Sequence, residues 1–271
     1  MTRKTPTFLE PAELAARVDD PELRVLDLSS RDNYLQGHVP GAVHLDVAAL
    51  QTSKPPVMGL MPDADALCRV LAEAGVAPEA HVVAYDDASG PKAGRLLYTL
   101  SVLGHDRVSM LDGGLVAWRE EGNLIDRQGE TPRSASYAAK AGSDAVATRG
   151  YILDHLEDPD VLLLDVRSPD EYAGRDLRAS RGGHIPGAIN VEWNRTLDYN
   201  RNLRLRPAAE LRTMFEAAGV TPDREVVTYC QSHMRSSHTF AVLRALGYPR
   251  LRGYPGSWSD WGNDPDTPVE A

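Results

Sequence analysis

The sequence predicts an α/β protein that consists of two successive copies of one unit, each a parallel sheet flanked by helices. Three observations predict this fold class. A series of short motifs occurs twice in the same order, and short β-branched or leucine-rich runs alternate with longer helical stretches. The length of 271 residues is also enough for about two domains of roughly 150 residues each.

The repeat extends over most of the chain. The stretch "VLDLSSRDNYLQGHVPGAVHLD" (25–46) returns as "LLDVRSPDEYAGRDLRASRGGHIPGAINVEW" (163–193). Asp27 corresponds to Asp165, 138 residues later, and His38 to His184, 146 residues later, so the second copy holds eight extra residues. Four blocks keep this order, since "VVAYDDASG" and "DGGLVAW" return as "VVTYCQSHM" and "PGSWSDW". We therefore expect a first domain at 8–126, a linker at 127–145 and a second domain at 146–268.

The elements follow in the same order in both copies. In the first copy, "LRVLDL" (23–28) and "HVVAY" (81–85) predict strands, and "DADALCRVLAEAGV" (63–76) predicts a helix between them that ends at Gly75. In the second copy, "DVLLLDV" and "EVVTY" predict the equivalent strands and "LRTMFEAAGV" the equivalent helix, which ends at Gly219. A last helix, "RSSHTFAVLRALG" (235–247), is expected to bury Phe240, Leu243 and Leu246 and to end at Gly247.

Composition excludes several classes of protein. The net charge of −10 disfavours nucleic acid or an anionic membrane as a partner, because either needs a basic face. No apolar run approaches the roughly 20 residues of a membrane span, and no apolar segment follows the basic residues at the N-terminus. Two cysteines without CxxC spacing make neither a disulfide framework nor a zinc site. We expect a cytoplasmic monomer without a metal.

Cys230 is the candidate nucleophile. It directly follows the strand "EVVTY" and precedes the last helix, so it lies in a strand-to-helix turn at the carboxyl end of a strand. Backbone N–H groups of such a turn, together with Arg235, favour a thiolate over a thiol. The alternative is a cysteine buried only for packing. That alternative is the expected role of the other cysteine, Cys68, which lies within a helix.

Two motifs resemble signatures of the rhodanese family. "YLQGHVPGAVHL" (34–45) is similar to the N-terminal signature of that family, and "YPGSWSDW" (254–261) to its C-terminal signature, with Asp260 where glutamate is usual. The chain thus resembles a tandem-domain rhodanese. The resemblance implies a six-residue active-site loop in the second domain, namely Cys230, Gln231, Ser232, His233, Met234 and Arg235. The first copy has Asp86 in place of the cysteine, which implies a catalytically inactive domain whose loop caps a helix.

The resemblance also implies a reaction. The Cys230 thiolate would attack the outer sulfur of thiosulfate or another small sulfur donor, and the resulting persulfide would pass its sulfur to cyanide, a thiol or a protein thiol. No metal or organic cofactor is needed. The family binds its anionic donor through arginines in the region of the insertion, where Arg175 is the best positional match and Arg181 follows it. These two and Arg178 can equally form a solvated loop.

A second set of residues matches a relay. In the related mercaptopyruvate sulfurtransferases, an aspartate, a histidine and a loop serine are thought to act together, and Asp27, His38 and Ser232 match these positions. The alternative is a structural role in a turn, because His38 recurs as His184 in the other copy. The loop "CQSHMR" is similar to a bacterial thiosulfate type rather than to the mercaptopyruvate type.

Three other functions remain open. The protein can be a 3-mercaptopyruvate sulfurtransferase, or a non-enzymatic sulfur carrier or docking module whose acceptor is a partner protein. A cysteine followed by an arginine in such a loop also occurs in cysteine-dependent phosphatases and arsenate reductases. Those phosphatases have five residues between the two, whereas this chain has four between Cys230 and Arg235. The shorter ring suits a sulfur atom better than a tetrahedral phosphate.

Overall fold

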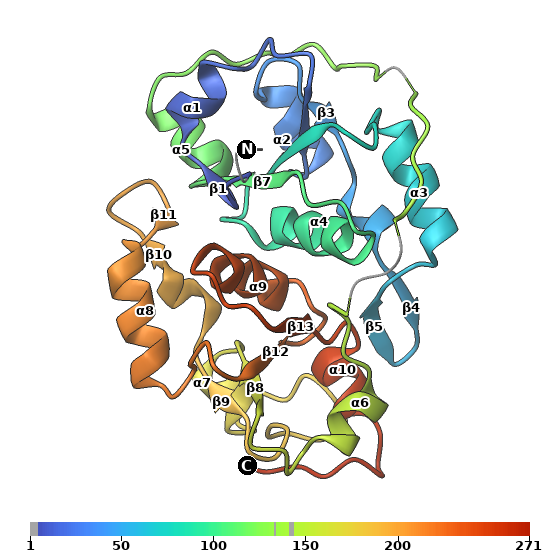
Figure 1. Ribbon diagram of the computed structural model, residues 1–271, viewed down its shortest axis with the longest axis vertical. Coiled ribbons are helices and arrows are strands. Elements are labelled where there is room, and N and C mark those ends of the chain that lie inside the picture. Colours follow the sequence, from blue (N-terminus) through green and yellow to red (C-terminus); the bar gives the residue numbers. More distant parts are fainter. Residues whose placement is uncertain (1–4, 133, 141–143) are drawn as a thin grey trace. The chain divides into compact units, whose positions relative to one another are not determined.

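The protein divides into two compact units, which follow the two repeats except for two exchanged segments (Figure 1). The computed structural model describes residues 5–132, 134–140 and 144–271. Gln51–Met61, from the first half of the sequence, belongs to the second unit, and Leu197–Leu205, from the second half, belongs to the first. The sequence repeat predicts two continuous domains and gives no sign of this exchange.

The first unit contains a five-stranded parallel sheet in the order β1-β7-β6-β2-β3. Its strands are β1 (Phe8–Leu9), β2 (Leu23–Asp27), β3 (Val43–His44), β6 (His81–Tyr85) and β7 (Val108–Leu111). Its helices are α1 (Pro11–Ala15), α2 (Arg31–Gln36), the short 3₁₀ helix η1 (Val47–Leu50), α3 (Ala64–Glu73), α4 (Pro91–Val102) and α5 (Gly114–Glu120). The exchanged segment adds an antiparallel hairpin of β10 (Leu197–Asp198) and β11 (Arg204–Leu205).

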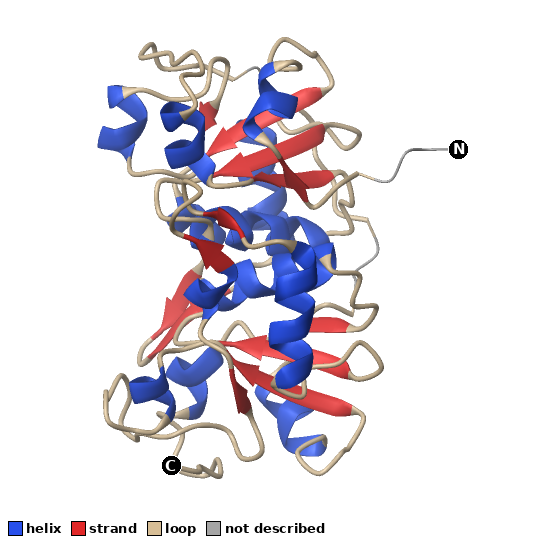
Figure 2. Ribbon diagram, turned by 90° about the vertical axis from the view of Figure 1, so that its left-hand side faces the viewer, coloured by secondary structure: helices blue, strands red, loops and turns tan. Residues whose placement is uncertain are grey.

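The second unit repeats this plan with a four-stranded parallel sheet in the order β13-β12-β8-β9. The strands are β8 (Val161–Asp165), β9 (Ile189–Asn190), β12 (Glu225–Tyr229) and β13 (Leu251–Gly253). The helices are α6 (Arg149–Asp154), α7 (Pro169–Tyr172), the 3₁₀ helix η2 (Trp193–Thr196), α8 (Ala208–Ala217), α9 (Arg235–Ala245) and α10 (Ser257–Trp261). The exchanged hairpin consists of β4 (Thr52–Lys54) and β5 (Val57–Leu60). Figure 2 shows strands enclosed by helices in each unit.

The expected α/β fold with parallel sheets is confirmed, and the predicted strands and helices form close to the expected positions. The three glycines expected to end helices, Gly75, Gly219 and Gly247, all adopt positive φ, a conformation that costs glycine little. The described residues between 127 and 145, the predicted linker, contain neither a helix nor a strand. Residues 133 and 141–143 of the predicted linker lie outside the described residues.

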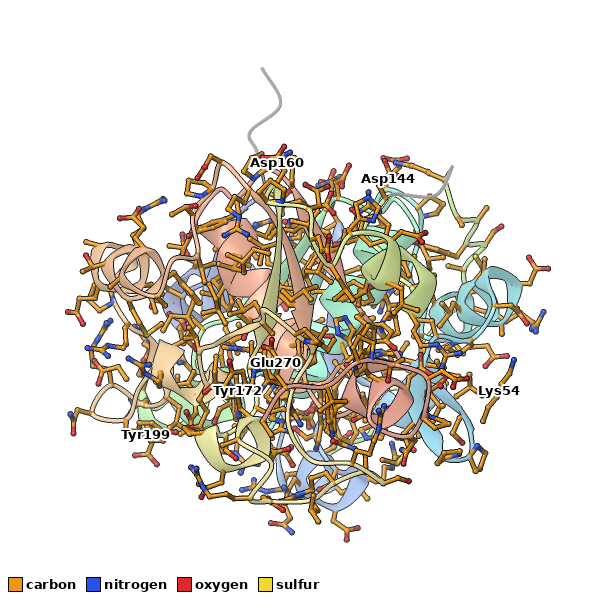
Figure 3. The ribbon with its side chains drawn as sticks, turned by 90° about the horizontal axis from the view of Figure 1, so that it is seen from below. Lys54, Asp144, Asp160, Tyr172, Tyr199 and Glu270 are labelled. Atoms are coloured by element: carbon orange, nitrogen blue, oxygen red, sulfur yellow. The ribbon has the colours of Figure 1, made fainter. Side chains whose placement is uncertain are left out.

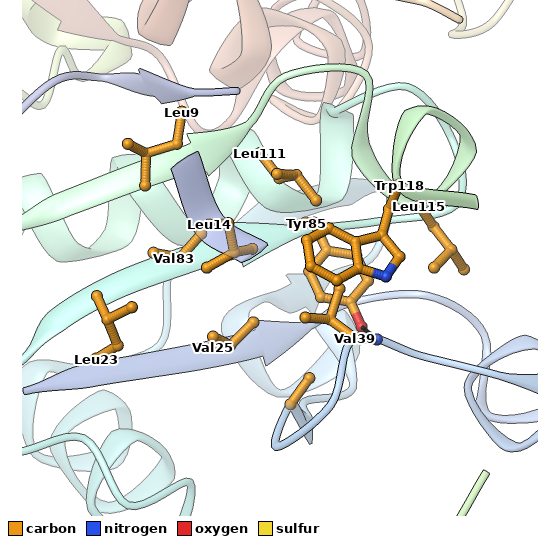
Figure 4. Packing of buried hydrophobic residues seen from close by; sticks show 11 residues of the cluster. Leu9, Leu14, Leu23, Val25, Val39, Val83, Tyr85, Leu111, Leu115 and Trp118 are labelled. Atoms are coloured by element: carbon orange, nitrogen blue, oxygen red, sulfur yellow. Dashed lines mark hydrogen bonds between the residues drawn. The ribbon is translucent and has the colours of Figure 1, made fainter. Parts of the chain in front are cut away.

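Each unit has its own apolar core. In the first unit, Trp118 of α5 packs with Tyr85 of β6 and Val39 on one face of the sheet (Figure 4), while α4 packs on β6 and β7. The Tyr85 hydroxyl accepts a hydrogen bond from the Val39 backbone N–H at 3.0 Å. The corresponding tyrosine of the second unit, Tyr229, accepts one from Ile185 at 3.2 Å. The repeat therefore extends to single side-chain contacts.

Helix α9 differs from its prediction. Instead of burying one apolar face, it buries every residue of the run from Ser236 to Leu243, including Ser236, Ser237, His238 and Thr239. A buried polar side chain is costly unless it is hydrogen-bonded, so the buried polar groups in the first turn of this helix need partners. Ser236 and Ser237 find theirs in the preceding loop, at 2.7 Å and 2.5 Å from atoms of His233.

None of the helices in the described part of the chain combines the length and the apolar character that crossing a membrane would require.

Candidate active site

Cys230 lies at the end of β12, in the turn that leads into α9. Strand β12 is central, between β13 and β8. The Cys230 side chain is buried, with 1% of its surface exposed. Cys68 is partly exposed on α3, and both cysteines are free thiols. The expected position of Cys230, in a strand-to-helix turn at the carboxyl end of a parallel strand, agrees with this arrangement.

Several donors are directed at the Cys230 sulfur. The Ser236 hydroxyl lies 3.5 Å from Sγ, and the backbone N–H groups of Ser232 and Ser236 also donate to it. Burial raises the pKa of the thiol, but the nearby charge of Arg235 and these hydrogen bonds outweigh burial, so the pKa lies below its ordinary value. This environment favours a nucleophilic thiolate.

The equivalent loop of the first unit holds a carboxylate in the same place. Asp86 is 1% exposed, and its Oδ1 accepts hydrogen bonds from the backbone N–H groups of Ala88 and Gly90 at 2.9 and 2.8 Å. Its Oδ2 accepts from Lys92 and Ala93 at 2.8 and 2.9 Å. Because Lys92 and Ala93 belong to the first turn of α4, Asp86 caps that helix as expected.

The two loops share their shape. Ala88 and Lys92 lie 144 residues before Ser232 and Ser236, so the same two positions donate to Asp86 in one unit and to Cys230 in the other. His233 has a φ of 56°, and Ser89, its counterpart, has a φ of 67°. Left-handed backbone is uncommon outside glycine, and consecutive N–H groups in such a turn form a nest for an anion. The nest is therefore a property of the repeated backbone.

Asp86→Ala is expected to destabilise the protein and to leave sulfur chemistry at Cys230 nearly unchanged. Four backbone N–H groups lose their acceptor, and a lost helix cap with buried unsatisfied donors costs about 2 kcal/mol or more. Denaturant unfolding of the folded variant measures the first effect, and kcat for sulfur transfer measures the second. A large fall in kcat at full folding would mean that the first unit takes part in the chemistry.

Arg235 forms a bidentate ion pair that the sequence interpretation did not include. Its Nη1 and Nη2 donate to Oε2 and Oε1 of Glu171 at 2.6 and 2.8 Å. The Glu171 side chain is only 3% exposed, against 25% for Arg235. Burial raises the pKa of Glu171, but the hydrogen bonds and the charge of Arg235 lower it to about 2. Glu171 thus fixes the guanidinium beside the cysteine.

A local signal for Glu171 does exist in the sequence. "SPDE" places serine and glutamate three residues apart, the pattern of a capping box at a helix N-terminus. Both reciprocal hydrogen bonds of that box are present, between Ser168 and Glu171. The box predicts a helix start and an oriented glutamate. It does not predict Arg235 as the partner, because the two residues are 64 apart in the sequence.

Helix α10 and the insertion hold the loop from other sides. The Cys230 N–H donates to the Ser257 hydroxyl at 3.3 Å, and the Cys230 carbonyl accepts from Trp258 at 2.9 Å. Ser257 has a φ of 51°, a strained backbone conformation, at the residue whose hydroxyl accepts this hydrogen bond. The Gln231 amide donates to the carbonyl of Arg178 at 2.8 Å. The eight extra residues therefore contact the loop through their backbone.

The exchanged β4–β5 hairpin also packs against the loop. Beside α10 (Figure 1), the Met58 N–H and carbonyl both bond to the Ser259 hydroxyl at 3.0 Å. Gly59, with a φ of 74°, faces the backbone of Ser232, and a Cβ at this position would lie 2.7 Å from the Ser232 carbonyl carbon. Only glycine permits this close approach of residue 59 to Ser232. Lys54, the last residue of β4, points outward (Figure 3).

Gly59→Ala is expected to lower both stability and the rate of sulfur transfer. The methyl group would overlap with Ser232, and overpacking of this kind costs about 1 to 3 kcal/mol and displaces the backbone that donates to Cys230. Gly187→Ala is the matched control, because Gly187 has a φ of 73° and open space around it. Thermal unfolding should detect strain in both variants. A rate loss of equal size in Gly187→Ala would refute the loop displacement.

The arginines of the insertion have partners of their own. Arg175 is exposed and donates to Asp170 at 2.6 and 2.8 Å, and Arg178 pairs with Asp176 at 2.8 Å. Arg181 donates to the carbonyls of Thr267, Trp261 and Asp264, which explains it as a residue that holds the C-terminal segment. Donor binding by Arg175 or Arg181 stays a prediction.

The three residues of the predicted relay do not belong to one unit. Asp27 and His38 are in the first unit and Ser232 is in the second. His38 stacks on Tyr34 with ring centroids 3.8 Å apart, and its Nδ1 lies 2.8 Å from the Tyr34 carbonyl. His184 repeats both contacts with Tyr172. The shared contacts support the structural alternative for His38.

Within the described residues, no cluster of three or more histidine, cysteine, aspartate or glutamate side chains could hold a metal.

Comparison with known proteins gives consistent matches. A rhodanese-like domain matches residues 10–121 and 148–264. Thiosulfate sulfurtransferases of Azotobacter vinelandii and Pseudomonas aeruginosa are each 44% identical over 265 residues, which cover 98% of this chain and 97% of the relative. An ergothioneine biosynthesis enzyme from Chlorobium limicola shares the fold, with a TM-score of 0.87 and 24% identity over all of this chain and 72% of its own.

The two matched segments coincide with the two repeats, and the cysteine-containing loop lies in the second of them. The chain therefore belongs to the rhodanese family and carries two rhodanese-like domains.

Proposed function

We propose that the protein is a thiosulfate sulfurtransferase, which moves the outer sulfur of thiosulfate to cyanide or a thiol through a persulfide on Cys230. The observation that carries the proposal is the set of donors around the Cys230 sulfur, which favours the thiolate that the reaction needs. The names of the relatives from Azotobacter vinelandii and Pseudomonas aeruginosa support thiosulfate as the donor.

In the first step, the Cys230 thiolate attacks the outer sulfur of thiosulfate. A new S–S bond forms, the bond between the two sulfurs of thiosulfate breaks, and sulfite leaves with the electron pair of that bond. The negative charge moves from the cysteine sulfur to the outer sulfur of the persulfide. Because the enzyme carries the same charge before and after the step, donors that stabilise the thiolate also stabilise the intermediate.

The carboxylate in the first unit suggests where the outer sulfur binds. The two oxygens of Asp86 accept hydrogen bonds from four backbone N–H groups, and two of these N–H groups belong to Gly90 and Ala93. The same positions of the second unit, 144 residues later, are Met234 and Ser237. A persulfide resembles a carboxylate because its negative charge lies one atom further from the backbone than the cysteine sulfur does. We infer that the N–H groups of Met234 and Ser237 bind the outer sulfur.

In the second step, cyanide or a thiolate attacks the outer sulfur. The persulfide S–S bond breaks, its electron pair returns to the Cys230 sulfur, and thiocyanate or an acceptor persulfide leaves. No cofactor enters either step. Both half-reactions use the same thiolate, so ping-pong kinetics are expected.

Binding of the donor needs a local positive charge, because the protein carries a net charge of −10. Arg235 is the proposed cation, with Glu171 setting its position. Arg175, at the protein surface, is proposed to assist capture of the donor before it reaches the loop. A cytoplasmic monomer that binds neither nucleic acid nor membrane fits the acidic composition.

Steady-state rates with thiosulfate and with 3-mercaptopyruvate on one preparation test the proposal. The kcat/KM for thiosulfate should exceed that for mercaptopyruvate. A faster reaction with mercaptopyruvate would make the protein a mercaptopyruvate sulfurtransferase. Failure of both donors, with a persulfide that passes only to a protein thiol, would favour a sulfur carrier. Hydrolysis of a phosphate ester at Cys230 would favour the phosphatase alternative.

A further inference from the structure

The Cys230 sulfur begins a chain of hydrogen bonds that leads to an imidazole. The Ser236 Oγ lies 3.5 Å from Cys230 Sγ, and the same Oγ lies 2.7 Å from Nδ1 of His233. All three side chains are buried, with at most 1% of their surface exposed. Since one hydroxyl can donate in one direction and accept from the other, Ser236 links the thiol to the imidazole.

We propose that Ser236 and His233 form a proton relay, which takes the thiol proton of Cys230 and keeps it on the His233 imidazole throughout the catalytic cycle. The assignment concerns the state of the sulfur, and it rests on the proposed sulfur transfer only for its effect on turnover. Neither residue matches the relay expected from the sequence, which used Asp27, His38 and Ser232.

The relay balances as one proton transfer. The S–H bond of Cys230 breaks and its electron pair stays on sulfur. The proton passes to Ser236 Oγ as the Ser236 hydroxyl proton passes to Nδ1 of His233. A thiol and a neutral imidazole thereby become a thiolate and an imidazolium, without a change in net charge. Because thiolate and persulfide carry the same charge, the proton remains on His233 throughout the cycle.

The loop geometry explains how the imidazole reaches Ser236. His233 adopts a φ of 56°, and its carbonyl accepts the Ser237 hydroxyl at 2.5 Å. A left-handed residue three positions before Ser236 turns its side chain back towards the first turn of α9. The first unit keeps the same backbone at Ser89, where no imidazole is present. The histidine is thus an addition of the cysteine-containing copy.

The charges around the relay permit an ion pair. Ionisable groups on the surrounding elements include Arg235, His238 and Arg244 on α9, Tyr229 at the end of β12, Glu171 on α7, Asp165 and Arg167 at the end of β8, and Asp260 on α10. Arg235 is paired with Glu171, Arg167 with Asp165, and Asp260 with Arg149. Burial lowers the pKa of His238 to about 4, which keeps that imidazole neutral at neutral pH. Within the hydrogen-bonded chain, Cys230 and His233 are the two groups that can exchange a proton through Ser236.

The rate of Cys230 alkylation by iodoacetamide, measured against pH, tests the relay without any sulfur donor. In Ser236→Ala and in His233→Asn the midpoint should rise by about 1 to 2 pH units, the effect of one lost charge-assisted hydrogen bond. Asparagine tolerates a left-handed backbone and keeps a neutral N–H, but it cannot hold the proton. The double variant should shift no further than either single variant, since the two residues act in series.

Thr239→Val is the matched control, because it removes an equally buried hydroxyl of the same helix that lies outside the chain from Cys230 through Ser236 to His233. Its midpoint should stay at the parent value. An unchanged midpoint in folded Ser236→Ala, or additive shifts in the double variant, would overturn the relay and leave the sulfurtransferase proposal intact. Shifted midpoints in a protein that transfers no sulfur would support the relay and overturn the sulfurtransferase proposal.

Nitrogen NMR of histidine-labelled protein gives a second test that needs no change in the loop serine. Both ring nitrogens of His233 should be protonated where Cys230 is a thiolate. In Cys230→Ala, the imidazole should be neutral at the same pH, because its counter-charge is gone. An unchanged protonation state of His233 in this variant would also overturn the relay.

Discussion

Cys230→Ala is expected to reduce sulfur transfer from thiosulfate to the uncatalysed level, a loss of at least about four orders of magnitude in kcat. In the proposed mechanism, the variant lacks the atom that carries the sulfur between the two half-reactions, and the other side chains cannot replace it. Alanine removes a small buried side chain, so the fold should survive. Stopped assays of thiocyanate formation, with circular dichroism as the folding check, measure the effect.

Cys68→Ala is the control for this variant. Cys68 lies partly exposed on α3 of the first unit, without a described hydrogen bond to its sulfur. Its replacement should leave kcat and KM at the parent values. Residual turnover in Cys230→Ala that disappears in the double variant would transfer the catalytic role to Cys68.

Arg235→Ala is expected to lower kcat/KM for thiosulfate by about 2 to 3 kcal/mol, which is roughly 30- to 150-fold. The change removes the charge that lowers the pKa of Cys230 and that is proposed to bind the donor. It also leaves the carboxylate of Glu171 buried without its partner, which costs about 3 kcal/mol of stability. Steady-state kinetics and denaturant unfolding separate the two effects.

Two further variants isolate the chemical role of Arg235. Arg235→Ala combined with Glu171→Ala should regain much of the lost stability but none of the lost rate. Arg175→Ala should act mainly through KM, because that side chain is exposed. An unchanged kcat/KM for thiosulfate in Arg235→Ala would contradict the proposed donor site.

The ion pair between Arg235 and Glu171 makes the stability of the protein depend on pH in acid. The pKa of Glu171 is lowered from 4.5 to about 2 by Arg235. A lowered pKa contributes stability above the unfolded value, and this contribution is lost as the pH falls from about 4.5 through about 2. In Arg235→Ala this part of the acid transition should move to higher pH.

The fold could be predicted from the sequence because both of its signals are local. Short apolar runs and helical spacing identify β6, α3, β12 and α9, and the repeat supplies a second copy of each assignment. The exchange of Gln51–Met61 and Leu197–Leu205 could not be predicted in this way. Short hairpins carry little periodicity, and the residues that they contact lie far away in the sequence.

The site was predictable to a similar extent. A cysteine after a β-branched run and before a helix identifies the candidate nucleophile and its loop. Glu171, Ser236 and Gly59 were not identified, since their roles depend on contacts with Arg235, Cys230 and Ser232 in three dimensions. For Arg181 the contacts supply a structural role that the positional match alone did not suggest.

Mass spectrometry of the protein after incubation with thiosulfate tests the central claim most directly. The intact mass should increase by one sulfur atom, peptide analysis should place that atom on Cys230, and addition of cyanide should remove it. Cys68 should remain unmodified. Sulfur on Cys68, or an unmodified Cys230 in a preparation that turns over thiosulfate, would contradict the account.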